Sequence, residues 1–298
     1  MVKKEENKRV KYIFRSSLLY KSKVEYADFC INHVEGCSHG CNFPCYAYMM
    51  ARRFGKVKSR AEWLKPKLVK NALELLDKEI PKYKDQIKFV HLCFTTDPFM
   101  YQYPEVADMT LKIINKLNSN GIKCTILTKG IYPKELLNIK KYSKDNEYGI
   151  TLVSLDKDFK DKFEPYSAPY MGRIKALKRL HDAGLKTWIS MEPFPTPNLI
   201  AGNAIQKLLK ILSEVSFVDN IIFGKLNYNV KSSSFPENGE FYEKCARIVE
   251  KFCKINRIKY HIKYGTKKVD NFSTVRIFRE RDSLYNFQAP NQREVLLA

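Results

Sequence analysis

Residues 36–48 read Gly36-Cys37-Ser38-His39-Gly40-Cys41-Asn42-Phe43-Pro44-Cys45-Tyr46-Ala47-Tyr48 and place three cysteines within nine residues. Three residues separate Cys37 from Cys41, and three more separate Cys41 from Cys45. Because glycine and proline interrupt this run, it predicts a loop that wraps around a compact object. Three thiolates can hold three irons of a [4Fe–4S] cluster and leave the fourth iron open, as a catalytic metal site requires.

Zinc is the alternative that the same part of the sequence allows. Cys30, His33 and His39 lie close to the three cysteines, so a Cys₃His site is chemically feasible. A structural zinc site usually pairs two knuckles separated by a dozen or more residues, and the sequence shows no second knuckle. The cysteines therefore favour an iron–sulfur cluster and leave zinc open.

The 298-residue chain is 44% hydrophobic, which suffices for one large core or for a main domain with a small appendage. No run approaches the roughly 18 apolar residues of a membrane-spanning helix. The N-terminus, MVKKEENKRV, lacks the apolar run and cleavage site of a secretory signal. Because clustered cysteines in such a chain indicate metal or redox chemistry, we expect a protein of the reducing cytoplasm with no membrane partner.

The formal net charge is +21, from 53 Lys and Arg against 32 Asp and Glu, and it favours polyanionic partners. Residues 51–70 hold eight basic residues and one acidic residue, with Phe54 and Trp63 among them. Residues 251–268 hold seven basic residues and no acidic one, in a predicted strand with one basic and one apolar face. Basic residues interleaved with aromatics suit DNA or RNA. A solvated lysine-rich surface is the alternative.

Apolar, β-rich runs alternate with segments of helical periodicity. Strands are expected at residues 25–34, 87–94, 123–128, 149–154, 186–191 and 220–224, with a last strand at 257–264. Helices are expected at residues 60–79, 106–117, 133–142, 170–183, 199–215 and 240–255, with Gly121 and Gly184 as helix stops. This order predicts an α/β fold, as an open doubly wound sheet or a partial barrel. Both place chemistry at the C-terminal ends of the strands. We divide the chain into a basic N-terminal arm (1–25), a core (26–235) and a C-terminal extension of helix and strand (236–298).

The motif GCSHGCNFPCYAY resembles the cluster loop of radical S-adenosylmethionine (SAM) enzymes, and more closely the branch around spore photoproduct lyase. The resemblance implies a partial (β/α)6 TIM-like barrel, a [4Fe–4S] cluster on Cys37, Cys41 and Cys45, and SAM on the open iron. An electron donor such as flavodoxin or ferredoxin then drives the cleavage of SAM to a 5′-deoxyadenosyl radical, which abstracts hydrogen from the substrate. The usual spacing is CxxxCxxC. Here one extra residue precedes Cys45, and the aromatic that normally precedes the third cysteine is displaced to Phe43, which the resemblance implies is a cofactor-binding residue.

The resemblance also assigns cofactor-binding residues to three strand ends. Thr95-Thr96-Asp97-Pro98 matches the motif that binds the SAM amine, with Asp97 or the Thr96 carbonyl as acceptor. Lys129 would meet the SAM carboxylate, and Ser154 would bind the ribose. Taken without the resemblance, Asp97 is part of an Asp-Pro turn and Ser154 is a helix cap.

Three further residues are candidate catalytic residues. Glu192 ends the fifth strand and could orient SAM or substrate, or pair with Arg173. Cys93 lies near the position of the hydrogen-donating cysteine of the lyases, but Phe94 occupies that position. In a regular strand, Cys93 would point to the opposite face. Tyr46 matches a tyrosine of that family.

The sequence therefore leaves three hypotheses for function. The first is a radical SAM enzyme that repairs or modifies a nucleic acid, with the lyase reaction itself as one form. The second is the same machinery acting on a peptide or small molecule. The third is a zinc-stabilised, non-enzymatic nucleic-acid-binding protein. The substrate and the oligomeric state are not set by the sequence.

Overall fold

The computed structural model describes residues 10–22 and 27–267. Its centre is an eight-stranded sheet in the order β11-β10-β9-β8-β7-β6-β3-β2. All neighbours in it pair in parallel except β2 and β3, which are antiparallel. The strands are β2 (Leu19–Lys21), β3 (Phe29–Ile31), β6 (Phe89–Leu92), β7 (Lys123–Thr128), β8 (Glu147–Thr151), β9 (Lys186–Phe194), β10 (Asn220–Lys225) and β11 (Lys259–Ile262).

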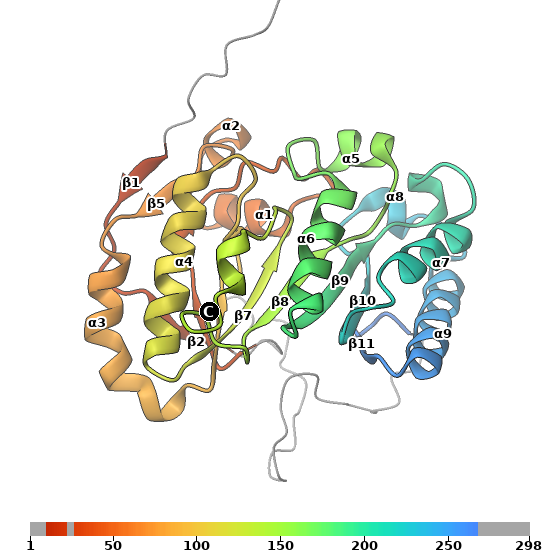
Figure 1. The fold of residues 1–298 in the computed structure, drawn as a ribbon. Coiled ribbons are helices and arrows are strands. Elements are labelled where there is room, and N and C mark those ends of the chain that lie inside the picture. The colour runs from red at the N-terminus through yellow and green to blue at the C-terminus, as the bar shows by residue number, and fades with distance from the viewer. Residues whose placement is uncertain (1–9, 23–26, 268–298) are drawn as a thin grey trace, which may run out of the picture.

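The seven parallel strands follow one another in chain order, from β3 to β11, without the reversal that marks a doubly wound sheet. The longer helices run along one face of the sheet (Figure 1). They are α3 (Ala72–Tyr83), α4 (Pro104–Ser119), α6 (Tyr170–Asp182), α7 (Ala204–Glu214) and α9 (Asn238–Asn256). Unbroken strand order with helices on one face is the arrangement of a partial (β/α) barrel. The expected α/β fold is confirmed.

The core lies between this sheet and its helices. Strands β6 and β8 are buried along their whole length, as expected of parallel strands covered on both faces, although their sequences FVHL and EYGIT include polar residues. The expected helix stops are confirmed, because Gly121 and Gly184 take left-handed φ angles of +76° and +78° just after α4 and α6. In the described part of the chain, no helix combines the length and the apolar character that a bilayer crossing requires.

A second, smaller sheet has the order β1-β5-β4, formed by β1 (Lys11–Ile13), β4 (Val34–Glu35) and β5 (Lys67–Val69). The expected helix over residues 60–79 is wrong in its middle. A short α2 (Arg60–Trp63) ends before Pro66, and β5 pairs with β1 and β4 before α3 begins. Proline disfavours continuation of the helix, and the two partner strands satisfy the backbone of β5 instead.

Two other helices differ from expectation. Residues 133–142 form only a 3-10 turn over Lys134–Leu137, because Asn138 leaves the helical region with ψ at 84°. The helix expected from residue 199 begins at Ala204, where the Asn203 side chain accepts hydrogen bonds from the N–H groups of Ile205 and Gln206. The proposed boundaries at residues 25 and 235 stay predictions. Residues 1–9, 23–26 and 268–298 of the arm and extension lie outside the described residues.

Candidate active site

The cysteine-bearing loop, residues 36–45, leaves β4 at the C-terminal edge of the large sheet and leads into α1 (Tyr46–Arg53). Its path requires two glycines in left-handed conformation, with φ of +82° at Gly36 and +69° at Gly40. A Cβ at Gly36 would lie 2.7 Å from the Trp63 carbonyl, so no larger residue fits. Arg60 donates to the carbonyls of Gly40 and Cys41 at 2.7 and 3.0 Å. Contacts with two residues of α2, Trp63 and Arg60, therefore fix the path of this loop.

The extra residue before Cys45 is accommodated by burial of Phe43. Its ring is 3% exposed and stacks on Phe163 at 5.4 Å, and the N–H of Asn42 donates to the Phe163 carbonyl at 2.9 Å. Cys45 then becomes the N-cap of α1, with extended backbone angles. The predicted cofactor role of Phe43 stays a prediction. The structure shows this side chain as part of an aromatic core under the loop.

The three cysteines are free and half-buried, and their thiols lie within electrostatic reach of one another. Burial raises the pKa of Cys37 well above its usual value, with Asp97 and Cys41 adding to the effect. Burial also raises the pKa of Cys41 to about 11, although Lys129 opposes this. A bound cation that stabilises thiolates would reverse both shifts.

The geometry of these thiols differs from a single-ion site. Among residues 10–22 and 27–267, no three Cys, His, Asp or Glu side chains converge on one metal position. A zinc ion needs four ligands at about 2.0–2.3 Å from one centre. Ligands of a cluster instead bind separate irons, so neighbouring thiols that do not converge fit a cluster better.

Both histidines of the alternative zinc site are already engaged. The N–H of Tyr101 donates to His39 Nε2 at 3.0 Å, so Nδ1 carries the proton and faces Asp97 Oδ2 at 3.4 Å. His33 contacts Thr110 Oγ1 through Nε2 at 2.7 Å and the Cys93 Sγ through Nδ1 at 3.4 Å. Burial lowers the pKa of His33 to about 3 and of His39 to about 4. Because each ring nitrogen of the two histidines already has a polar partner, the structure does not support a Cys₃His site.

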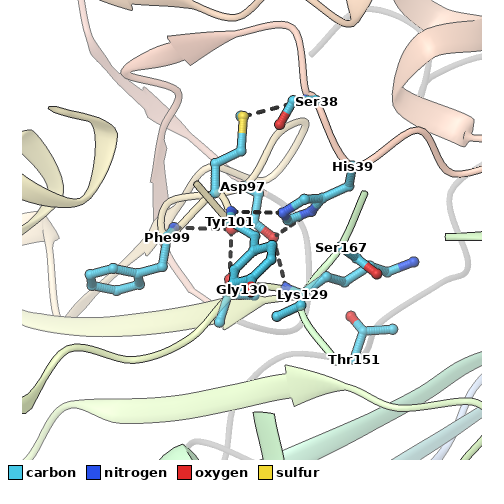
Figure 2. Close-up of polar contacts among 12 residues, drawn as sticks. Ser38, His39, Asp97, Phe99, Tyr101, Lys129, Gly130, Thr151 and Ser167 are labelled. Carbon is cyan, nitrogen blue, oxygen red and sulfur yellow. Dashed lines mark hydrogen bonds and ion pairs between the residues drawn. The ribbon is translucent and has the colours of Figure 1, made fainter. Parts of the chain in front are cut away.

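Asp97 is the centre of the polar network at the ends of β6 and β7 (Figure 2). It is 5% exposed. Its Oδ1 accepts from Thr128 Oγ1 at 2.6 Å and from the N–H of Phe99 at 3.0 Å, and its Oδ2 accepts from the N–H of Lys129 at 2.7 Å. With His39 also facing Oδ2, the carboxylate has filled the acceptor positions that an ionised Asp offers.

Thr95 and Thr96 lie half-buried between Asp97 and the end of β6. The N–H of Thr95 donates to the Asn32 side chain at 3.1 Å, and the Thr96 hydroxyl donates to the Val34 carbonyl at 3.2 Å. Both contacts tie the Thr-Thr-Asp-Pro turn to the segment that leads into the cysteine loop. The structure thus brings this motif beside the loop, as the order of the motifs implied.

Lys129 follows β7 and points at the cysteine loop. Its Nζ lies 3.4 Å from Cys41 Sγ and 2.7 Å from Glu164 Oε1. Glu164 is fully buried and forms a second ion pair with Arg173, at 2.8 Å between Oε2 and NH2. Burial opposes ionisation of Glu164, but the charges of Lys129 and Arg173 lower its pKa to about 2. Sequence reasoning missed Glu164. Its position in the loop after α5 (Lys157–Phe163) carries no periodic signal.

The remaining predicted residues lie at other strand ends. Ser154, 3% exposed, accepts from the N–H of Asp156 at 3.0 Å in the turn that precedes α5. Glu192 faces Lys263, at 3.5 Å between Oε2 and Nζ. The suggested pairing of Glu192 with Arg173 is wrong, because Arg173 is a buried residue of α6 and pairs with Glu164.

Cys93 and Tyr46 both follow the cysteine loop in sequence, Tyr46 directly and Cys93 after β6. Strand β6 ends at Leu92, and Cys93 has a left-handed φ of 58°, so the alternation of a regular strand no longer sets its direction. Its thiol is buried against His33. Tyr46 is 41% exposed, and its ring lies 6.1 Å from that of Tyr228.

Comparison with known proteins places these features in a family. A model of the radical SAM superfamily matches residues 31–199, which include the cysteine loop and the ends of β6, β7 and β8. An uncharacterized protein of Acidianus two-tailed virus is 25% identical over 236 residues, 72% of this chain and 76% of its own length. An uncharacterized protein of Methanocaldococcus jannaschii is 27% identical over 183 residues, 60% of this chain and 64% of its own length.

Two solved structures show the same fold. Spore photoproduct lyase complexed with dinucleoside spore photoproduct aligns with a TM-score of 0.63 at 14% identity, over 85% of this chain and 81% of that chain. A lyase variant with bound AdoMet (SAM) and the dinucleoside photoproduct aligns with a TM-score of 0.61, also at 14% identity and over the same shares of both chains. The predicted barrel type, that of the spore photoproduct lyase branch, is confirmed.

Proposed function

The chain belongs to the radical SAM superfamily, and on this premise we propose that it is an enzyme that modifies a nucleic acid, with a [4Fe–4S] cluster on Cys37, Cys41 and Cys45. The donor set supports the cluster, because three free thiols on one rigid loop neighbour one another without converging on a single ion. The cluster and SAM, when bound, supply a radical that removes a hydrogen atom from the substrate.

The chain's own residues would then hold SAM at the strand ends. Asp97 has its acceptor positions filled, so we assign the SAM ammonium to the carbonyl of Thr96 and give Asp97 the role of fixing that turn. Lys129 carries the positive charge that a carboxylate needs beside Cys41. Ser154 accepts one hydrogen bond and keeps its hydroxyl proton for the ribose. Glu192 would act on the substrate side of the site.

The observation that carries the nucleic-acid proposal is a pair of exposed tyrosines at the mouth of the barrel. Tyr46 directly follows the last cluster cysteine, and Tyr228 follows β10 with 66% of its surface exposed. The Asn229 side chain donates to the Phe43 carbonyl and so ties the Tyr228 loop to the cysteine loop. Two exposed rings beside a reactive centre suit stacking of unpaired bases.

Positive charge lies next to this pair. Arg60 and Lys67 are used inside the fold, but the other six basic residues of 51–70 are exposed on α1 and in the connections that follow α1, α2 and β5. They are Arg52, Arg53, Lys56, Lys58, Lys65 and Lys70. The second basic stretch is placed differently. Its exposed Lys259 begins β11, at the opposite edge of the sheet from the cysteine loop.

The first stretch therefore supplies the phosphate-binding part of the proposed substrate surface, whereas the second stretch contributes its residues after β11, Lys263 and Tyr264. A phosphate backbone along α1 would bring a splayed base to Tyr46 and Tyr228. The aligned lyase structure holds a dinucleoside photoproduct, which is consistent with this substrate class. The proposal does not extend to lyase chemistry, because Phe94 stands where the lyases have a cysteine and Cys93 is buried against His33.

Deuterium transfer tests the substrate class. Anaerobically reconstituted protein, reduced by flavodoxin, ferredoxin or dithionite, is incubated with SAM and perdeuterated single-stranded oligonucleotides. We expect deuterium in the 5′-deoxyadenosine product, measured by mass spectrometry. If the 5′-deoxyadenosine acquires deuterium from labelled peptides but never from DNA or RNA, the proposal is overturned in favour of a peptide substrate. Electron donors that support the reaction would be identified in the same assay.

A further inference from the structure

Lys129 occupies a place that its neighbours determine closely. Its backbone N–H donates to Asp97, and its carbonyl accepts from the N–H of Ala168 at 3.0 Å. Its Nζ lies 5.1 Å from the centre of the Phe43 ring, 2.7 Å from Glu164 and 3.4 Å from Cys41 Sγ. A flexible lysine side chain is thus held at both ends, and its ammonium points at one thiol of the loop.

Glu164 owes its own position to α6 and β8. Arg173, on α6, donates through NH2 to Glu164, through Nε to the Ala168 carbonyl and through NH1 to the Thr151 carbonyl, each at 2.8–2.9 Å. Glu164 and Arg173 are both fully buried. Water therefore does not screen the pair, and neither partner can turn away without leaving a buried charge. The carboxylate is a fixed anchor for Lys129.

We propose that Glu164 is a positioning residue: braced by Arg173, it holds the Lys129 ammonium against Cys41 so that an N–H···S bond raises the reduction potential of the cluster. The inference rests on the proposed function, since Cys41 must be a cluster ligand. Hydrogen bonds to ligand sulfurs are among the factors that set cluster potentials. A cation beside the ligand stabilises the added electron, so the shift is toward easier reduction.

The reduction potential of the reconstituted, SAM-free protein tests this inference. It is measured by potentiometric titration with electron paramagnetic resonance. We expect Lys129→Met to make reduction about tenfold less favourable, a fall of 59 mV for one electron. Lys157→Met, which removes an exposed lysine paired with Asp161 on α5, is the matched control and should leave the potential unchanged.

Glu164→Asp separates position from charge. It keeps every charge but shortens the anchor by one methylene, so the ammonium is drawn away from Cys41 and the potential falls. In the Lys129→Met background the same substitution should have no effect, because the group that Glu164 positions is gone. Lys129→Arg, which keeps the charge, should lower the reduction potential less than Lys129→Met does.

Three results would count against the inference. An unchanged potential in Lys129→Met, with iron content equal to wild type, would overturn it while leaving the proposed function intact. A Glu164→Asp shift of the same size in both backgrounds would show that Glu164 does not act through Lys129. Wild-type protein that takes up no iron and sulfide would instead overturn the proposed cluster and this inference together.

Discussion

The two halves of the strand-end surface are built differently. At the ends of β6, β7 and β8, the charged groups around Lys129 are buried and fully engaged: Asp97 is 5% exposed, and Glu164 and Arg173 are not exposed at all. At the ends of β9, β10 and β11, the side chains of Glu192 and Lys263 are about one-quarter exposed, at 26% and 25%. Tyr228 and Tyr264 of the same half are 66% and 77% exposed.

This difference indicates a division of labour. Buried polar networks hold their members in one geometry, because moving one leaves another unsatisfied. Such rigidity suits a cofactor that is the same in every reaction cycle. Exposed and loosely paired side chains suit a ligand that enters and leaves. We therefore assign the closed half, β6–β8, to the cluster and SAM, and the open half, β9–β11, to the substrate.

The closed half should be sensitive to acid, and His33 gives the largest expected effect. Its pKa is lowered from 6.5 to about 3 by burial. As the pH falls, His33 therefore takes up a proton in the unfolded chain before it does so in the folded protein. Its contribution to the free energy of unfolding is present above pH 6.5 and is lost as the pH falls toward 3. The loss amounts to about 3 kcal/mol between pH 7.5 and pH 4.5. Urea unfolding of wild type and His33→Gln across this range measures it.

His33→Gln removes the titrating group, so its free energy of unfolding should depend less steeply on pH. At pH 7.5 the variant should be less stable than wild type by roughly 1–2 kcal/mol, because the contacts with Thr110 and Cys93 change. If the two pH profiles run parallel from pH 7.5 to pH 4.5, buried His33 does not account for acid sensitivity.

A matched pair of carboxylate-to-amide changes compares the halves directly. Asp97→Asn replaces one acceptor oxygen by an NH2 group, which faces either the donors of Thr128 and Phe99 or those of Lys129 and His39. We expect a loss of about 2–3 kcal/mol in the free energy of unfolding. Glu192→Gln, in the open half, should cost less than about 1 kcal/mol. Equal losses in the two variants, measured by urea unfolding, would remove the distinction between the halves.

The open half should respond in binding rather than in stability. Tyr228→Ala removes one stacking surface, worth about 1–3 kcal/mol per base, so affinity for a single-stranded oligonucleotide should fall roughly tenfold. Fluorescence anisotropy at fixed salt measures the change. Tyr12→Ala, an exposed tyrosine on β1 (55% exposed), is the control and should bind as wild type. Tyr228→Ala with wild-type affinity would remove the base-stacking argument.

The sequence predicted those parts of the fold and site that local patterns encode. Parallel strands appear as mainly apolar runs, Lys129 directly follows β7, and Asp97 lies in the turn after β6. Parallel pairing in chain order brings these strand ends to one edge. The cysteines are close in sequence, so their loop could be recognised without the fold.

Features that depend on tertiary packing were missed. Glu164 becomes the anion between Lys129 and Arg173 only because α6 packs on β8, and nothing in its local sequence marks it. Strand β5 forms because β1 and β4 flank it, which overrides the helical spacing of that segment. The donors that fill the acceptor positions of Asp97 likewise come from three separate elements. They change its assignment from a SAM ligand to a support of the turn.

The central claim is that Cys37, Cys41 and Cys45 hold a cluster that cleaves SAM. The most direct measurement is 5′-deoxyadenosine production from SAM under dithionite, in the absence of oxygen and of substrate. Anaerobically reconstituted wild type should form it, with about four irons and four sulfides per chain. Cys41→Ser should not form it, whereas Cys253→Ala, on distant α9, should behave as wild type. Folded wild type that binds one zinc and no iron, and releases no deoxyadenosine, would contradict the account.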